Sequence, residues 1–423
     1  MINIAKKDFK NGFLNFIANF YDPILLAILT PILINNLSLE IYGIWVLIFS
    51  IANFAKLGSA GMNSSIIKFL GSFNSKKKKE KYLINILFLF ISYSTVFIIL
   101  ISIIFWIFNF DSLFNIDAII SFEYFFIIAL IFVIFKSFEE CILAVYLSFE
   151  DYKSSTFLKI FSKTIIFIMQ IYVIISYKDI TVLLETSCIT LFLIILFQVL
   201  ILKKKYQIIN FHNLNNLINF GIIKKYFYYS KGLIISNLIN IMNLNIDKYL
   251  LAYFLGLKTL GLYNIAFLIF SLIHSVFNSF FFYLFPKMNR IKDKSVRFRT
   301  FIRAEINIIL IGFLSLCFIL VTSNFFLKIW LGNVYDPIIY DYHRIFLLIN
   351  FLILPTIPIY YYLVTLDNTS IQAKMAFYTM ILSTILMIIL FNFFSVYGVI
   401  FSKASMIIVS VIAFIHISKI QNK

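Results

Sequence analysis

The sequence predicts an all-α polytopic membrane protein with about 12 transmembrane helices. Three observations predict this class: 62% of the 423 residues are hydrophobic, only 13% are charged, and the mean hydropathy is +0.97. A soluble globular chain is about half apolar and a quarter charged, so this excess cannot be hidden in one water-facing core. About 262 apolar residues, at roughly 20 residues per span, leave room for roughly a dozen helices. Soluble enzymes and secreted disulfide scaffolds are therefore excluded.

Twelve apolar runs are long enough to cross the hydrocarbon. Each is expected to be a helix, because a helix satisfies its own backbone hydrogen bonds where no water is present. In chain order, the predicted spans are 13–34, 42–66, 82–108, 121–147, 157–176, 180–202, 232–254, 262–285, 304–327, 344–366, 375–393 and 398–417.

The positions of the basic residues predict the orientation of these spans. With the N-terminus inside, 28 of the 36 Lys and Arg residues fall on the inner side, and only 4 fall in the outer loops. Cytoplasmic loops are enriched in Lys and Arg, so both termini are predicted to be cytoplasmic. The net charge of +17 is accordingly interpreted as a topology signal and as contact with anionic lipid, with no nucleic-acid partner.

The spans divide into two groups of six. Residues 1–202 are predicted to form an N-terminal lobe with helices 1–6, and residues 232–423 a C-terminal lobe with helices 7–12. The connection between them, 203–231, is basic and has spaced apolar residues, which favours a cytoplasmic amphipathic helix that lies on the membrane surface.

An internal repeat relates the two lobes at an offset of 221 residues. LEIYGIWVLIFSI at 39–51 aligns with LGLYNIAFLIFSL at 260–272, which places Tyr42 on Tyr263 and Asp22 on Asn243. Helices 1 and 7 point the same way, so the lobes are predicted to form a parallel pseudo-repeat about an axis along the membrane normal, as in known transporters.

No motif for covalent chemistry, phosphate cradling or metal binding was found. The sequence has no GxxxxGK[ST], HExxH, paired CxxC or GxSxG, and no metal site or cofactor is expected. The longest predicted outer connection is only about 328–343. Because membrane glycosyltransferases and polysaccharide polymerases usually carry their catalytic residues in a large external loop, the protein is predicted not to be an enzyme.

Polar residues inside the spans are the candidate site, because they are costly in hydrocarbon and usually face a cavity. In the first two helices, Asp22 and Lys56 have similar depth and lie on polar stripes. In the second lobe, Lys403 has no acidic residue nearby in the sequence, which favours a wet cavity. The other polar positions singled out on spans are Asn19, Asn53, Asn240, Asn243, Asp247, Lys248 and His274.

Other interpretations of these residues stay open. Asp22 and Lys56 could neutralise each other as a buried pair between neighbouring helices. The Asn stripes could hold helices together by hydrogen bonds, and His274 could be a packing residue.

Four segments carry a family resemblance that extends over essentially the whole chain. They are NFIANFYDPILLAILTPILINNLSLEIYGIWVLIFSIANFAKLGSAG near the N-terminus, NIDKYLLAYFLGLKTLGLYNIA in helix 7, LFPKMNRIK after helix 8 and IWLGNVYDP after helix 9. In order and spacing they resemble Wzx-type O-antigen and polysaccharide flippases. These form the polysaccharide-transport branch of the superfamily that also contains MATE multidrug exporters and the lipid II flippase MurJ.

The resemblance implies a MATE-like fold of two six-helix lobes around a central cavity in the bacterial cytoplasmic (inner) membrane. The implied substrate is an undecaprenyl-diphosphate-linked oligosaccharide, moved without a covalent step. Lys56, Lys248 and Lys403 would meet its diphosphate and acidic sugars, while Asp22, next to Pro23, fits an H⁺ or Na⁺ coupling site. Asp247 is a second ion-coupling candidate. The mid-span cations are few, and all are lysines.

Partners and alternatives follow from this interpretation. Membrane lipid and polysaccharide assembly proteins are the expected partners besides the lipid-linked glycan of O-antigen or lipopolysaccharide. The first alternative is a MATE-like multidrug or cation antiporter, which would need an acidic and aromatic cavity, whereas the mid-span charge here is mixed. The second is a membrane glycosyltransferase or polysaccharide polymerase, which the short outer loops disfavour.

Overall fold

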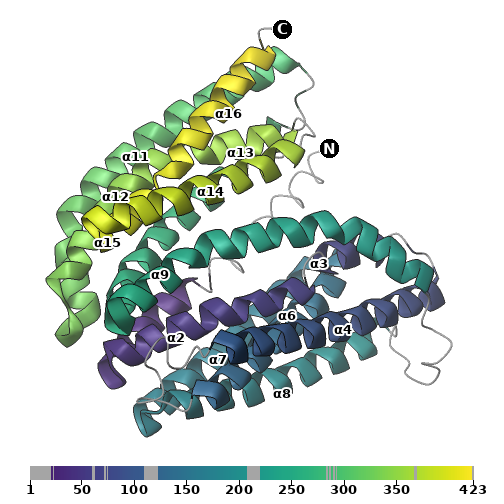
Figure 1. Cartoon of the computed structure of the whole chain (residues 1–423). Helices are drawn as coiled ribbons and strands as arrows, with labels where there is room; N and C mark the ends of the chain where they lie inside the picture. The colour runs from purple at the N-terminus through teal and green to yellow at the C-terminus, as the bar shows by residue number, and fades with distance from the viewer. Residues whose placement is uncertain are drawn as a thin grey trace. The chain divides into compact units, whose positions relative to one another are not determined.

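The computed structural model describes residues 21–421, apart from Asp22 and the gaps at 60–61, 71–72, 74, 109–121, 207–219, 283, 285–286, 289–290, 292 and 366–368. All regular secondary structure in these residues is helical (Figure 1). The contacts divide the chain into two compact units, Met1–Ile241 and Met242–Lys423. The lobe and linker boundaries at 202/203 and 231/232 remain predictions.

The first unit consists of helices whose lengths match most of the predicted spans. They are Pro23–Asn36, α2 (Leu39–Ala52), η1 (Asn53–Ser59), α3 (Met62–Ser65), η2 (Ile66–Leu70), α4 (Lys76–Phe108), α6 (Phe122–Ser148), α7 (Tyr152–Tyr177) and α8 (Ile180–Tyr206), followed by the start of α9 (Phe220–Phe281). The amphipathic segment predicted at 203–231 lies partly outside the described residues, and α9 begins within it.

The second predicted span, 42–66, is not one continuous α-helix. Regular α2 ends at Ala52, and the chain continues as the 3-10 helix η1, the short helix α3 and the π-helical segment η2. Gly58 and Ser59 have weak helix propensity, and 3-10 segments commonly follow helix ends. Hydrophobicity alone does not distinguish these helix types. Lys56 lies on this irregular segment.

Polar contacts join the helices of the first unit inside their apolar surroundings. The amide of Gln198 on α8 donates to the buried carboxylate of Glu139 on α6 at 3.0 Å. The Gln170 amide on α7 likewise donates to the Ser187 hydroxyl on α8 at 3.2 Å. Buried polar groups need such partners, so these pairs fix the packing of α6, α7 and α8, which lie side by side in Figure 1.

The turn between α6 and α7 is held by one carboxylate. Asp151 caps α7 by accepting from the Ser154 backbone N–H at 3.3 Å, and it also accepts from Lys205 and from the Tyr206 hydroxyl at the end of α8. Partial burial acts to raise the pKa of Asp151, but the hydrogen bonds from Lys205 and Tyr206 outweigh it and lower the pKa to about 2.

The second unit contains the remaining spans. Its helices are the later part of α9, α11 (Lys294–Leu331), η4 (Gly332–Val334), α12 (Pro337–Ile353), α13 (Thr356–Thr365), α14 (Thr369–Phe394), α15 (Val396–Ser402) and α16 (Ser405–Gln421). The spans predicted at 232–254 and 262–285 follow each other along α9, which ends at Phe281. The helix breaks between them at Gly256, whose φ of 81° and ψ of 172° are not helical. Glycine adopts this positive φ without steric strain, so it marks the boundary between the two spans.

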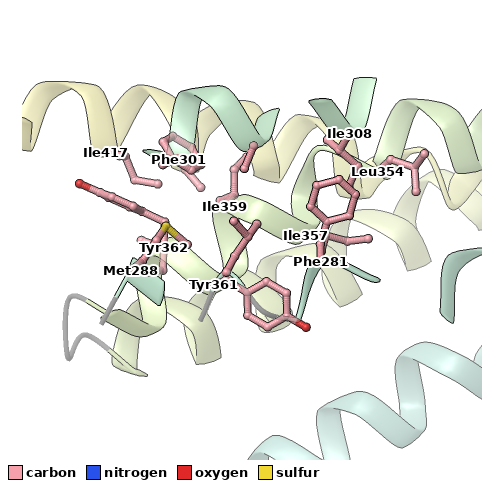
Figure 2. Packing of buried hydrophobic residues seen from close by; sticks show 14 of the residues in the cluster. Phe281, Met288, Phe301, Ile308, Leu354, Ile357, Ile359, Tyr361, Tyr362 and Ile417 are labelled. Atoms are coloured by element: carbon pink, nitrogen blue, oxygen red, sulfur yellow. The ribbon is translucent and has the colours of Figure 1, made fainter. Parts of the chain in front are cut away.

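One apolar cluster forms the core of the second unit (Figure 2). Phe281 from the end of α9 packs with Phe301 and Ile308 of α11, and α13 and α16 contribute Tyr362 and Ile417. Burying such side chains stabilises a membrane protein mainly through dispersion contacts, because lipid tails are as apolar as the core.

Two closely spaced joints lie near the start of the last predicted span, one before it and one within it. Ser395, with a φ of 52°, separates α14 from α15. A Cβ on Gly398 would lie 2.2 Å from the Leu390 carbonyl oxygen, so only glycine allows this approach of the two backbones. The second joint is at Lys403 and Ala404, whose backbone N–H groups donate to Ile400 and Phe401 in the tighter 3-10 pattern.

The internal repeat is reflected in the burial of matched residues. Tyr42 and Tyr263 are both buried, as are Ile44 and Ile265. Each of these pairs lies on the second helix of a helix pair, α2 in the first unit and the part of α9 after Gly256 in the second.

The helices identify a polytopic membrane protein. Among the described residues, eight helical stretches are long and apolar enough to cross a membrane, one of which includes both parts of α9, while Pro23–Asn36 and α2 are shorter apolar helices. The chain is therefore an all-α membrane protein, in agreement with the prediction of about 12 spans.

Candidate functional site

A buried carboxylate stands at the centre of the candidate site in the second unit. Asp247 lies on the first part of α9 and is 0% exposed. Its Oδ2 accepts a hydrogen bond from the Tyr263 hydroxyl at 2.5 Å and forms a salt bridge with Lys403 Nζ at 2.8 Å. Its Oδ1 has no hydrogen-bond partner among the described residues. A charge in an apolar interior is tolerated only when it is paired in this way.

Two breaks in regular helical structure bring these groups together. Gly256 separates Asp247 and Tyr263 into two parts of α9, so that the hydroxyl can reach the carboxylate. Lys403 lies at the joint between α15 and α16, and its Nζ also donates to the Asn243 carbonyl at 3.4 Å. The sequence shows no acidic residue near Lys403, and the fold supplies one, Asp247, from α9.

A second cation lies beside the pair. Lys248 Nζ donates to Asn245 Oδ1 at 3.0 Å. The ammonium groups of Lys248 and Lys403 also approach the ring of Phe267, at 5.8 and 5.7 Å from its centroid, within the range of cation–π attraction. Two cations and one carboxylate give these three charged side chains a formal charge of +1.

A hollow with both polar and apolar residues in its wall adjoins this cluster. It has a volume of about 350 Å³ and includes Lys403 in its wall. In its wall, the Ser383 hydroxyl on α14 donates to Asn243 Oδ1 at 3.3 Å. The polar residues that line the hollow are Asn243, Ser271, His274, Ser275, Asn278, Thr379, Ser383, Lys403 and Ser405, and its apolar residues include Phe267 and Phe270. Small-molecule sites typically have volumes of about 300–1,000 Å³.

The structure unites most of the candidates from the second lobe. Asn243, His274 and Lys403 line the hollow, and Asp247 contacts Lys403 directly. The ammonium groups of Lys248 and Lys403 both lie near the ring of Phe267. Asn240, one helical turn earlier on α9, is exposed and is not part of the described wall of the hollow.

The candidates from the first lobe are only partly described. Asn53 and Lys56 lie on η1, and both are half-buried. Asn19 and Asp22 lie outside the described residues. The expectation that Asp22 and Lys56 face a cavity therefore stays a prediction, as does the alternative that they form a buried pair.

Sequence reasoning missed several residues of the site. Tyr263, Asn245, Phe267 and Ser383 were not proposed, although Tyr263 was already matched with Tyr42 in the repeat. A tyrosine that recurs at a repeat position, within reach of a polar helix stripe, is the signal that could have identified it. Asn245 and Phe267 carry no such signal in an Asn- and Phe-rich chain with 52 Phe residues.

Comparisons with known proteins agree on family and fold. The family model described as "Polysaccharide biosynthesis protein" matches residues 9–292, and no curated protein matches the chain. An inward-closed structure of the lipid II flippase MurJ is similar with a TM-score of 0.69 at 15% identity, covering 99% of this chain and 88% of that one.

Two further solved structures share the fold. An inward-facing multidrug resistance MATE family transporter of the MOP superfamily has a TM-score of 0.68 at 11% identity, covering 96% of this chain and 94% of that one. A MOP superfamily transporter from Pyrococcus furiosus has a TM-score of 0.60 at 11% identity, covering 99% and 96%. The fold is therefore that of MATE and MurJ transporters.

Proposed function

We propose that this chain, which belongs to the polysaccharide biosynthesis protein family, is a flippase for an undecaprenyl-diphosphate-linked oligosaccharide. In this proposal it moves the repeat unit of O-antigen or another surface polysaccharide across the bacterial cytoplasmic membrane by alternating access. It is a transporter, with no covalent step, and both termini lie on the cytoplasmic side.

The observation that carries the proposal is a positively charged cluster beside a hollow that has polar side chains in its wall, within membrane-spanning helices. A diphosphate and sugar hydroxyls are strongly disfavoured in hydrocarbon, whereas the polyprenyl tail can stay in lipid. Lys403 lies in the wall of the hollow and can bind the phosphate oxygens. Asn243, His274 and Ser383 offer the amide, imidazole and hydroxyl groups that hydrogen-bond to sugars.

Ion coupling is the second part of the proposal. Asp247 is a carboxylate with one unpartnered oxygen among the described residues, so it could take up H⁺ or Na⁺ if its salt bridge to Lys403 opened. Asp22, next to Pro23 in the first span, is the other coupling candidate.

The fold similarity to multidrug MATE transporters favours one other candidate function, the export of organic cations. The charge of the cluster opposes it, because a cationic drug in the hollow would meet Lys403. The two candidates differ in the sign of the charge on the substrate.

The test is a depletion experiment in a strain without a redundant flippase. We expect depletion to leave lipid-linked repeat units on the cytoplasmic face and to stop surface polysaccharide assembly, while synthesis of the unit continues. A matched strain that expresses Lys403→Met should behave like the depleted strain. Normal surface glycan after depletion would contradict the proposal, and hypersensitivity to cationic drugs instead would favour the exporter.

A further inference from the structure

We infer that the isoprenoid tail of the lipid-linked substrate leaves the hollow between α14 and α16 and lies in an apolar groove that these two helices form. The inference rests on the proposed function, because it requires a headgroup in the hollow beside Lys403. It assigns the binding of the tail to one helix pair, separate from the polar residues that meet the headgroup.

The groove lies between α14 and α16, which are connected by α15 and diverge from it (Figure 1). It has a volume of about 680 Å³. Of the described residues in its wall, only Lys374, near the start of α14, is charged. An apolar chain can therefore lie in the groove without removing many polar groups from their partners. The apolar residues that line it include Tyr378, Ile381, Ile385, Ile408, Val409 and Ile412.

The hollow and the groove lie on two faces of α14. Thr379 and Ser383 line the hollow, whereas Tyr378 and Leu382, each one residue earlier, line the groove. Successive residues of an α-helix are turned by about 100° around its axis. The helix thus presents hydroxyl groups to the hollow and apolar side chains to the groove. Only a thin wall of side chains from this helix stands between the two spaces.

Along α16, the hollow and the groove follow each other. Ser405 and Met406 at its start line the hollow, and Ile408 already belongs to the groove. Ser405 and Ile408 lie within one helical turn, about 5 Å apart along the axis. Lys403, which would bind the phosphate, directly precedes this turn. A lipid with its phosphate at Lys403 can therefore place the first part of its chain in the groove.

The contact between α14 and α16 can open without leaving polar groups unpartnered. The Thr379 and Ser383 hydroxyls donate to carbonyls of their own helix, and Ser410 on α16 does the same. The described residues show no hydrogen bond that joins α14 to α16. In addition, α16 begins after the 3-10 joint at Lys403, and such segments are common at hinges.

The covalent link to the headgroup decides which lipid tail occupies the groove. Transfer of a tail from the bilayer into the groove contributes little, because lipid tails are as apolar as its wall. A tail whose headgroup is bound in the hollow is held beside the groove at a high effective concentration. A phospholipid whose headgroup stays at the membrane surface lacks this second attachment, so the groove takes the tail of the substrate.

The first test detects the tail by photo-crosslinking. A photoreactive amino acid replaces Ile385 or Ile412 in the groove, or Ile388 or Ile415 as matched controls. The controls are exposed isoleucines on the same two helices, outside the groove. The full-length protein is placed in nanodiscs of phosphatidylethanolamine and phosphatidylglycerol with undecaprenyl diphosphate, or uncharged undecaprenol, as the probe. Mass spectrometry then gives the ratio of crosslinked probe to crosslinked phospholipid at each position.

We expect undecaprenyl diphosphate to be enriched over phospholipid in the groove by at least about fivefold relative to the control positions. Undecaprenol should show no enrichment, because it has no phosphate for Lys403. The double variant Asp247→Leu with Lys403→Leu, which leaves no buried charge of this pair alone, should lose the enrichment. Equal ratios at groove and control positions would overturn the inference. Enrichment of undecaprenol, or enrichment that persists in the double variant, would also overturn it, because the tail would then bind independently of the hollow.

The second test measures the flipping of lipid-linked oligosaccharide in proteoliposomes. Ile412→Trp fills part of the groove and should slow flipping at least about tenfold, whereas Ile415→Trp adds the same ring outside the groove and should flip near the wild-type rate. If Ile412→Trp fails to fold, Ile385→Trp with the control Ile388→Trp tests the other wall. Wild-type flipping by the groove variants contradicts the position of the tail alone, whereas absence of flipping by the wild type contradicts the proposed function.

Discussion

The hydroxyl of Tyr263 donates to Asp247 Oδ2 at 2.5 Å across the break in α9 at Gly256. Both side chains are fully buried, and Asp247 Oδ2 accepts from Tyr263 in addition to its salt bridge with Lys403. This contact connects two successive spans at the point where the cationic cluster begins. The hydrogen bond from Tyr263 therefore fixes the position of the Asp247 carboxylate, which forms the salt bridge with Lys403.

Replacing Tyr263 by Phe should destabilise the protein without changing its shape. The substitution removes one donor from a buried carboxylate, which typically costs about 1–3 kcal/mol. Thermal unfolding in detergent should show a lowered midpoint. The control Tyr378→Phe alters an exposed tyrosine on α14 and should change stability by less than about 0.5 kcal/mol. Equal effects of the two variants would mean that the hydrogen bond to Asp247 does not contribute to stability.

The salt bridge between Asp247 and Lys403 makes a second prediction, about single and double variants. Lys403→Leu leaves the buried carboxylate without its cation and should cost about 3–5 kcal/mol. Asp247→Leu combined with Lys403→Leu removes both charges and should recover most of that loss. The double variant should nevertheless fail to flip lipid-linked oligosaccharide in proteoliposomes. Full transport by the double variant would show that the Asp247–Lys403 pair has only a structural role.

The spans could be predicted from sequence because hydrophobicity and length are what lipid requires of a helix. The same reasoning failed for 42–66, where Gly58 and Ser59 follow an apolar run and the chain turns to 3-10 and π geometry. Gly256 carried no special signal either. Hydrophobicity reports where a segment lies, whereas its backbone geometry depends on packing.

The candidate site could be predicted only where local periodicity sufficed. Asn243 and Asp247 were found because they recur at helical spacing on one stripe. The partner of Lys403 was missed, because Asp247 is distant in the sequence and only the fold brings α9 to the joint between α15 and α16. Long-range pairing of single charges leaves no pattern in one sequence.

Asp151 predicts a pH dependence at the turn between α6 and α7. Its pKa is lowered from 3.8 to about 2 in the folded protein, so its contribution to stability is fully present above the unfolded value and is lost as pH falls from about 4 towards 2. Thermal unfolding between pH 5 and pH 2.5 should show this loss in the wild type. In Asp151→Asn the loss should be smaller, and an identical pH profile would contradict the contact with Lys205 and Tyr206.

The basic residues predict the topology of the third span, which corresponds to α4. A periplasm-active reporter fused near Leu113 should be active, and one fused near Lys78, at the start of α4, should be silent. A cytoplasm-active reporter should give the opposite pattern, because 28 basic residues fall on one side and 4 on the other. Reporters that place both sites on the same side would show that α4 does not cross the membrane.

Lys56 and Asp22 provide the last prediction, for the first span pair. Lys56 is half-buried on η1, and both residues are expected at similar depth on polar stripes. Lys56→Ala should abolish transport while the protein still accumulates in the membrane, and Asp22→Asn should impair transport with an altered dependence on pH or sodium. The matched control is Lys68→Ala, which alters an exposed lysine on η2 and should keep transport near the wild-type level.

The competing explanation for this pair is a purely structural ion pair. In that case Lys56→Ala leaves a buried carboxylate unpaired and lowers stability, so the protein level in the membrane should fall along with transport. Asp22→Leu combined with Lys56→Leu should then restore both, because two apolar side chains carry no desolvation cost. A transporting double variant would exclude both residues from substrate binding and ion coupling, and would leave the cluster around Lys403 as the site that meets the headgroup.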